Sequence, residues 1–305
     1  MNASQLVICL LFVAVGLILG MDPATTTQEP VPIASDQDLL AIQLVEQLGD
    51  SSPDERGEAR EGLLLLGAAA VPALIGATES TSAVLRWEAV NLLGTLGDLR
   101  ATDAVLLVAM SDCDVHARWR ANWAITSLDD GTVVSRLIAK LEDDNPVLAW
   151  NCAVTLSLFG AAEAVPFLHR GLNAQDWRQW EAVNALGRVW NGATVSKLIV
   201  VLREGPEDVR KEAALSLGYI GGAEVLVALL GALSEDASFE VRWRAAMMIG
   251  HMGNREAAAE LRDIRTRESH PFVIETIDKA IEALTSEAGS RAPVSDASAG
   301  CVVAG

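Results

Sequence analysis

Five tryptophans recur at one position of a tandem repeat, and this period limits what the chain can fold into. They are Trp87, Trp119, Trp150, Trp180 and Trp243, separated by 32, 31, 30 and 63 residues. The last step spans two repeats, with Lys211 at the position between them. A fixed period near 31 residues predicts a stack of similar small units.

Each repeat contains two helices according to its apolar pattern. The position before each tryptophan, and the matching position in the two repeats without one, is here called the arginine slot. It falls at Arg56, Arg86, Arg118, Ala149, Gln179, Arg210 and Arg242. Three residues later the side chain is small, seven later it is aliphatic, and ten later it is large and apolar, as in Ala89, Leu93 and Leu96. These spacings share one helix face. A second apolar segment and an acidic loop then follow, for example residues 224–233 and 234–238.

The pattern predicts an all-α solenoid of about seven two-helix repeats over residues 36–285. A helix over residues 36–48 precedes the repeats and one over residues 273–284 follows them, and both are suited to end the stack. Residues 21–35 are rich in Pro and Thr and are expected to form a flexible linker. Residues 286–305 are rich in Ser, Ala and Gly and are expected to be a disordered tail.

The repeats resemble HEAT repeats, most of all the short HEAT-like repeats of phycobilisome bilin lyases. The segments that carry the resemblance include RKEAALSLGYIGGAEVLVALLGALSED and RWRAAMMIGHMGNREAAAELRDI. The resemblance covers roughly residues 37–285 and implies an α–α superhelix of the armadillo type. It implies little about function, because such repeats serve unrelated roles.

The resemblance also implies an inter-repeat ladder, in which the slot arginine pairs with an acid of a loop between repeats. The ladder arginines are Arg86, Arg118, Arg210 and Arg242, with Asp112, Asp114, Asp208 and Asp236 as nearby acids. Ala149 and Gln179 interrupt this ladder. We therefore expect the fourth and fifth units to be the softer middle of the stack.

The recurring tryptophans predict a partner-binding stripe, because the resemblance places the slot helix on the concave side of the superhelix. The predicted stripe consists of Trp87, Asn91, Trp119, Trp123, Trp150, Trp180, Asn184 and Trp243. Polar residues two positions after the slot (Glu88, Arg120, Asn151, Glu181, Glu212 and Arg244) favour an exposed side. The alternative is that each indole ring packs over its neighbouring repeat. Exposed indoles are frequent interface anchors, so we expect a protein or extended peptide as partner.

An apolar segment near the N-terminus predicts export or a membrane tether. Residues 6–19 are uncharged and almost wholly apolar, which is short for a bilayer span but suits a signal-peptide core. No Lys or Arg precedes the segment, and the first basic residue is Arg56. Three interpretations remain: residues 1–20 are a cleaved signal peptide, they are an uncleaved anchor, or translation starts at Met21. The first two place the repeats outside the cytoplasm, and the third leaves them in it.

The net charge of −18 argues against nucleic acid as a partner. Three alternatives would each account for the acidity: a need for solubility, a cationic partner or a high-salt habitat. Deoxyhypusine hydroxylase, an enzyme of similar repeats, holds iron with His-Glu dipeptides. Here the residues after the four histidines are Ala117, Arg170, Met252 and Pro271.

The sequence contains no nucleotide-binding or nucleophile motif, and we expect no catalytic, metal-binding or cofactor-binding residues. The predicted function is a non-catalytic interaction scaffold. The alternative is a subunit that resembles a bilin lyase and handles a tetrapyrrole, or a chaperone-type subunit. An oxidoreductase that resembles deoxyhypusine hydroxylase is less favoured.

Overall fold

The fold is a curved stack of paired helices. The computed structural model describes residues 35–49, 52–189 and 192–286, and within these ranges it contains sixteen α-helices and no strands. This arrangement confirms the predicted all-α solenoid. The expected signal or anchor segment, most of the linker and most of the tail lie outside the described residues.

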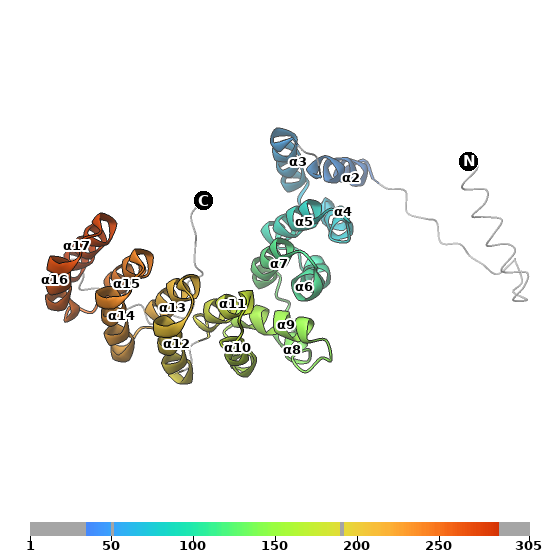
Figure 1. Ribbon diagram of the computed structural model, residues 1–305. Coiled ribbons are helices and arrows are strands. Elements are labelled where there is room, and N and C mark those ends of the chain that lie inside the picture. Colours follow the sequence, from blue (N-terminus) through green and yellow to red (C-terminus); the bar gives the residue numbers. More distant parts are fainter. Residues whose placement is uncertain (1–34, 50–51, 190–191, 287–305) are drawn as a thin grey trace, which may run out of the picture.

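Helix α2 (Asp36–Leu48) begins the stack, and α17 (Pro271–Thr285) ends it. The first helices of the seven units are α3 (Pro53–Leu66), α5 (Ala83–Leu96), α7 (Val115–Ser127), α9 (Pro146–Leu158), α11 (Trp177–Leu186), α13 (Glu207–Ile220) and α15 (Phe239–Met252). The second helices are α4 (Val71–Ala77), α6 (Thr102–Ser111), α8 (Val133–Ile138), α10 (Val165–Gly171), α12 (Gly192–Glu204), α14 (Ala223–Glu235) and α16 (Ala257–Arg267). The first helices line the inner side of the curve and the second helices lie outside it (Figure 1).

Helix boundaries follow from local signals in the sequence. Ser52 caps α3 by accepting a hydrogen bond from the Glu55 amide, and Pro53 occupies the first helical position. Asn145 and Pro146 begin α9 in the same way. Gly97 ends α5 in the left-handed conformation, with φ of 65°. The apolar faces of these helices then form one continuous hydrophobic core along the stack.

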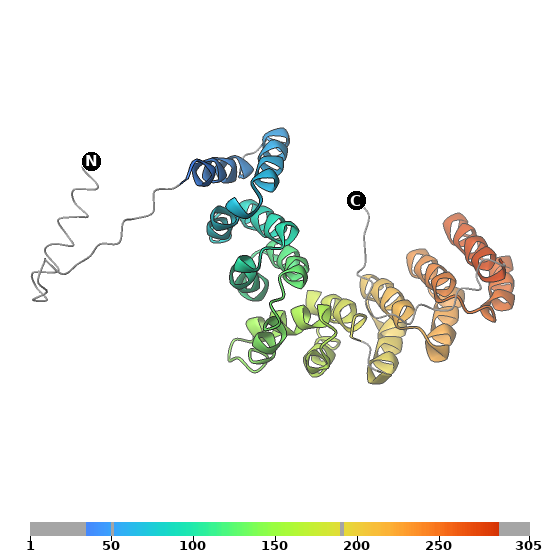
Figure 2. The same ribbon diagram turned by 180° about the vertical axis from the view of Figure 1, so that it is seen from behind.

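The stack bends between α7 and α9, which gives it an N-terminal and a C-terminal arm (Figures 1 and 2). Eight residues after the arginine slot, glycine allows adjacent first helices to pack closely. A Cβ atom added to Gly94 would lie 2.6 Å from the Cβ atom of Ala124, and one added to Gly218 would lie 2.4 Å from that of Met248. Thr126 and Ser157 occupy this position in α7 and α9. Accordingly, α7 contacts α9 over a much shorter stretch than it contacts α5.

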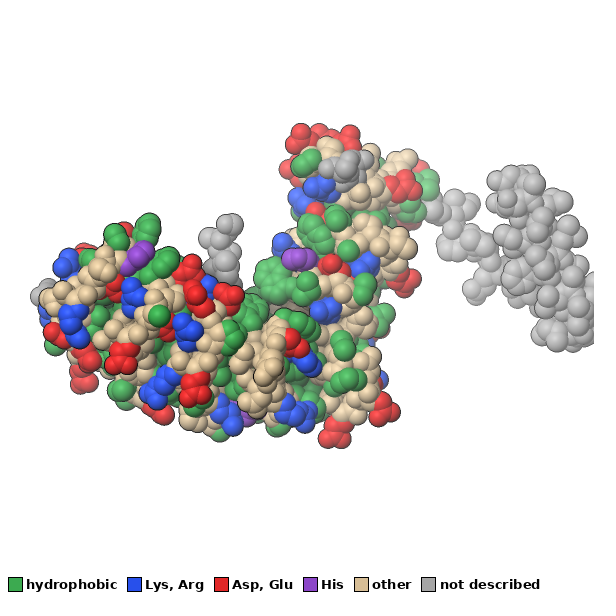
Figure 3. Space-filling view, viewed as in Figure 1, with side chains coloured by type: hydrophobic (Ala, Val, Ile, Leu, Met, Phe, Trp, Pro, Cys, Tyr) green, Lys and Arg blue, Asp and Glu red, His purple; other side chains and the backbone are tan. Residues whose placement is uncertain are grey.

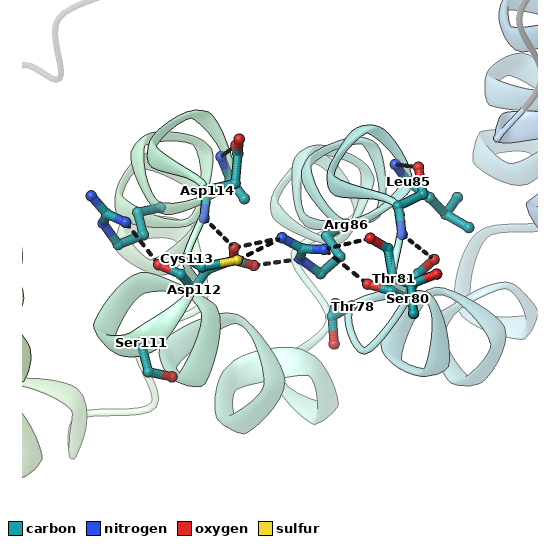
Figure 4. Close-up of polar contacts among 12 residues, drawn as sticks. Thr78, Ser80, Thr81, Leu85, Arg86, Ser111, Asp112, Cys113 and Asp114 are labelled. Atoms are coloured by element: carbon teal, nitrogen blue, oxygen red, sulfur yellow. Dashed lines mark hydrogen bonds and ion pairs between the residues drawn. The ribbon is translucent and has the colours of Figure 1, made fainter.

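Ladder arginines join neighbouring units in both arms. Arg86 forms a bidentate ion pair with Asp112, with Nε–Oδ2 and Nη2–Oδ1 distances of 2.7 and 2.8 Å, and it also donates to the carbonyl oxygen of Ser80 (Figure 4). The same arrangement joins Arg210 to Asp236 and Arg242 to Glu268. Such charge-assisted, two-point contacts are strong and fix geometry.

Three other details of the predicted ladder differ in the structure. Arg118 donates to the backbone carbonyl of Asp112 and forms no ion pair within the described chain. Asp114 caps α7 by accepting from the Ala117 amide, because it lies directly at the start of that helix. Asp208 pairs with Lys211, one turn further along α13, and not with an arginine.

Both partners of the ladder are missing where it is interrupted. Each ion pair joins residues 26 positions apart, and the residues 26 positions after Ala149 and Gln179 are Gln175 and Gly205. Gln179 instead donates to the Leu172 carbonyl oxygen at 2.9 Å. Cavities of about 600 and 1140 Å³ adjoin Ala149 and Gln179, respectively. Loss of the ladder therefore coincides with open space between units.

No single helix of the described chain is long and apolar enough to cross a membrane. One pair, Pro53–Ala69 with Val71–Ala77, meets the length and composition requirement together, but it is bent by 120°.

Candidate partner-binding groove

Three indole rings converge on a small cavity at the inside of the bend. Trp119 and Trp123 extend from α7 and Trp180 from α11, and their exposed fractions are 52%, 40% and 43%. The cavity measures about 160 Å³. That is similar to an apolar cavity of about 150 Å³ that binds benzene, so one large side chain would fill it. Figure 3 shows a hydrophobic patch on the inside of the bend.

Polar side chains complete the wall of this indole cavity. Asn122, Asn184, Arg118 and Arg188 line it together with the three tryptophans. Asn184 Nδ2 donates to Glu212 at 2.6 Å, which leaves the amide oxygen of Asn184 as an acceptor for a ligand. The cavity therefore combines aromatic surface with groups that bind peptide amides.

Trp150 does not line this cavity, although it belongs to the predicted stripe. Its ring packs so closely on Gly171 of α10 that an added Cβ atom there would lie 2.3 Å from the ring. Its Nε1 atom donates to Glu181 at 2.6 Å. Trp150 is therefore half-buried between the fourth and fifth units. This agrees with the alternative interpretation, in which an indole ring packs over its neighbouring repeat.

The remaining stripe residues also lie outside the cavity. Trp87 is half-buried against the core of α5, and the Arg120 guanidinium lies 5.6 Å from its ring centroid and 5.3 Å from that of Trp119. Trp243 is 37% exposed on α15, and Asn91 is half-buried on α5. The periodic tryptophans thus occupy several environments, because the bend changes what each one faces.

A second, larger cavity of about 1140 Å³ adjoins the first and shares Trp180 with it. Trp177, exposed by 54%, and Arg244 line it. Sequence periodicity missed Trp177, because it lies three residues before the repeated position. Its spacing of three residues from Trp180 places both rings on the same side of the helix, and this spacing could have indicated Trp177 as a site residue. The two cavities, which share Trp180 in their walls, are together called the tryptophan groove, built around Trp119, Trp123, Trp177 and Trp180.

The expectation that the residues two after the slot are exposed was wrong. Glu88, Asn151 and Glu212 are only 1%, 6% and 8% exposed. Each binds a group from another helix: Arg60 pairs with Glu88, Asn184 donates to Glu212, and Asn151 donates to the Met110 carbonyl oxygen. These polar residues satisfy one another between units, so their polarity does not signal contact with solvent.

Buried charges lie beneath the groove. Burial raises the pKa of Glu181, and the hydrogen bond from Trp150 and the charges of Arg118 and Arg188 oppose that increase. Burial lowers the pKa of Arg188, against the opposing effect of Glu212 and Glu181. Removal from water, rather than any single partner, dominates the electrostatics here.

The histidines do not converge on a metal centre. His169 Nε2 lies 3.1 Å from the Thr194 hydroxyl, His251 contacts the Tyr219 ring, and His270 stacks on Phe239. Within residues 35–49, 52–189 and 192–286, no three His, Cys, Asp or Glu side chains are grouped as a metal site would require. The donor set does not fit the iron site implied by deoxyhypusine hydroxylase.

Comparison with known proteins agrees with this geometry. A sequence profile described as HEAT repeats matches residues 102–187 and 195–285, more than half of the chain. The chain belongs to the HEAT-repeat family. This confirms the resemblance found in its repeats.

Among curated proteins, deoxyhypusine hydroxylase-B of Oryza sativa subsp. japonica is 33% identical over 143 residues. The match spans 46% of the HEAT-repeat chain and 45% of the rice protein, so the chain spans less than half the length of this relative.

Three solved structures are similar to the chain. E. coli YibA is 18% identical, with a TM-score of 0.49, over 84% of this chain and 99% of that one. The Nostoc complex of CpcE and CpcF of phycocyanin lyase is 20% identical, with a TM-score of 0.43, over 85% and 98%. Human deoxyhypusine hydroxylase in complex with glycerol is 19% identical, with a TM-score of 0.36, over 81% and 96%.

Proposed function

We propose that the protein is an interaction scaffold whose tryptophan groove binds an extended segment of a partner protein. The observation that carries this proposal is the convergence of Trp119, Trp123 and Trp180 on one cavity while each ring stays at least 40% exposed. Indoles left open to water at a concave surface gain free energy when a partner covers them.

The size of that gain supports a specific complex. Covering about 80 Å² on each ring contributes about 2 kcal/mol at about 25 cal/mol/Å². Three rings then contribute about 6 kcal/mol, and hydrogen bonds to Asn122 and Asn184 add to this against the entropy cost of association. Micromolar affinity requires about 8 kcal/mol net, so a partner that binds this tightly must also bury surface beyond the three rings.

The test is a double variant, Trp119→Ala with Trp180→Ala, studied by quantitative affinity purification of the full chain. We expect it to lose the partners that the wild type retains. Trp243→Ala is the matched control, because Trp243 is also a partly exposed indole of a first helix but lines neither cavity. If the double variant folds normally and retains the same partners, the groove is not the binding site.

We further propose that residues 6–19 export the chain or tether it to a membrane, with the repeats outside the cytoplasm. The support is the uninterrupted apolar run in the sequence. Mass spectrometry of the N-terminus and fractionation of cells expressing the full chain test this. A soluble cytoplasmic protein that starts at Met21 would contradict it.

A further inference from the structure

Two guanidinium groups in the tryptophan groove have no hydrogen-bond partner. Within the described chain, neither Arg188, in the indole cavity, nor Arg244, in the larger cavity, forms a hydrogen bond or an ion pair, and the Nε atom of Arg244 is buried. A guanidinium carries five N–H donors, and leaving buried donors unpaired is costly. The slot arginines Arg86, Arg210 and Arg242, by contrast, all form bidentate pairs.

Two acids near Arg188 already accept hydrogen bonds from other groups. Glu181 accepts the Trp150 indole N–H, and Glu212 accepts the Asn184 amide. Both acids influence Arg188 through space, yet neither lies within pairing distance of it. Arg188 and Arg244 therefore remain available as donors in the groove.

Resting on the proposed function, we propose that the groove selects acidic segments, with partner carboxylates bound by Arg188 and Arg244 and a neighbouring apolar side chain in the indole cavity. A carboxylate matches the planar fork of a guanidinium in a two-point contact. A phosphate carries about twice the charge at neutral pH, and Glu204, Asp208 and Glu212 around the larger cavity would repel it more strongly.

The net charge of −18 gives this recognition a distinctive salt dependence. Long-range repulsion slows the approach of an acidic segment, while the contacts in the groove act at short range. Added salt screens the repulsion, so association with an acidic segment becomes faster as salt rises. A basic segment would show the opposite trend.

The experiment is selection from a display library of random 12-residue peptides on the full-length protein, with the Trp119→Ala/Trp180→Ala variant as background. We expect wild-type-specific peptides to share Asp or Glu beside a large apolar residue. A basic or uncharged consensus would overturn the acidic preference while leaving the proposed function in place. No enrichment over the background variant would overturn both.

The selected peptide then tests the arginines directly. Replacing its Asp or Glu by the amide should weaken binding to the wild type about tenfold, as expected for loss of a charge-assisted hydrogen bond. In Arg244→Gln, and in Arg188→Gln if that variant folds, this difference should shrink. Arg203→Gln is the control, because Arg203 is an exposed arginine of α12 outside both cavities and should keep the full difference. A tenfold difference that persists in Arg244→Gln would contradict the assignment.

Discussion

The last two units (α13 to α16, with α17) and the central units (the fourth and fifth, α9 to α12) differ in two sequence positions, and these positions account for much of their difference in structure. Gly218 brings α13 close to α15, Gly250 brings α15 close to α17, and Arg210 and Arg242 form ion pairs with the loops that follow. In the fourth unit both devices are absent, with Ala149 at the slot and Ser157 at the glycine position, and in the fifth Gln179 replaces the arginine. The regions that lost these contacts are those that open into the groove.

The largest expected effect comes from the close contact between α13 and α15 at Gly218. Gly218→Ala should destabilise the fold by about 1–3 kcal/mol, because the new methyl group would overlap Met248. Gly231→Ala on α14 is the control, since nothing lies near an added Cβ atom there, and it should stabilise by up to about 1 kcal/mol. Urea unfolding measures both. Equal effects of the two substitutions would disprove the role of the glycine position.

Breaking the ladder should have a somewhat smaller effect that depends on position. Arg210→Ala leaves Asp236 without its bidentate partner, and we expect a loss of about 2 kcal/mol. Gln179→Ala removes one hydrogen bond to a backbone carbonyl, and we expect a loss of about 0.5–1 kcal/mol. Thermal and urea unfolding of the two variants compare the sixth unit with the fifth. A larger loss of unfolding free energy for Gln179→Ala than for Arg210→Ala would contradict the proposed role of the ladder.

Acidification should change the stability of the two regions in opposite directions, and each change should be modest. The Arg242 hydrogen bond lowers the pKa of Glu268 to about 2 from an ordinary value of 4.5, so the stability from this pair is complete above pH 4.5 and is lost as the pH falls towards 2. Burial raises the pKa of Glu181, so its protonation as the pH falls towards 4.5 stabilises the central units.

The variant that isolates the central effect is Glu181→Gln, which keeps an acceptor for Trp150. Stability curves measured between pH 7 and 4.5 should rise less steeply towards acid in this variant than in the wild type. Identical slopes would remove Glu181 as a source of the pH dependence.

The repeat period predicted the fold well, because small, aliphatic and large apolar residues recur at the spacing of one helix face. It predicted the positions of Trp119, Trp123 and Trp180, but not that Trp150 would turn towards Gly171. That orientation is found beside the bend between α7 and α9, where Thr126 stands in place of glycine. The burial of Glu88 and Glu212 also escaped sequence reasoning, since a polar residue satisfied by the next repeat has the same pattern as an exposed one.

Hydrogen exchange of the free, full-length protein, followed by mass spectrometry, tests the central contrast most directly. Two effects compete in the middle of the stack: the ladder is interrupted, while α9 is enclosed at the bend, with Asn151 to Ser157 all buried. We expect the interrupted ladder to dominate, so that residues 145–200 exchange faster than the helices of residues 207–285. Finding residues 145–200 to be the best protected part of the chain would contradict the account.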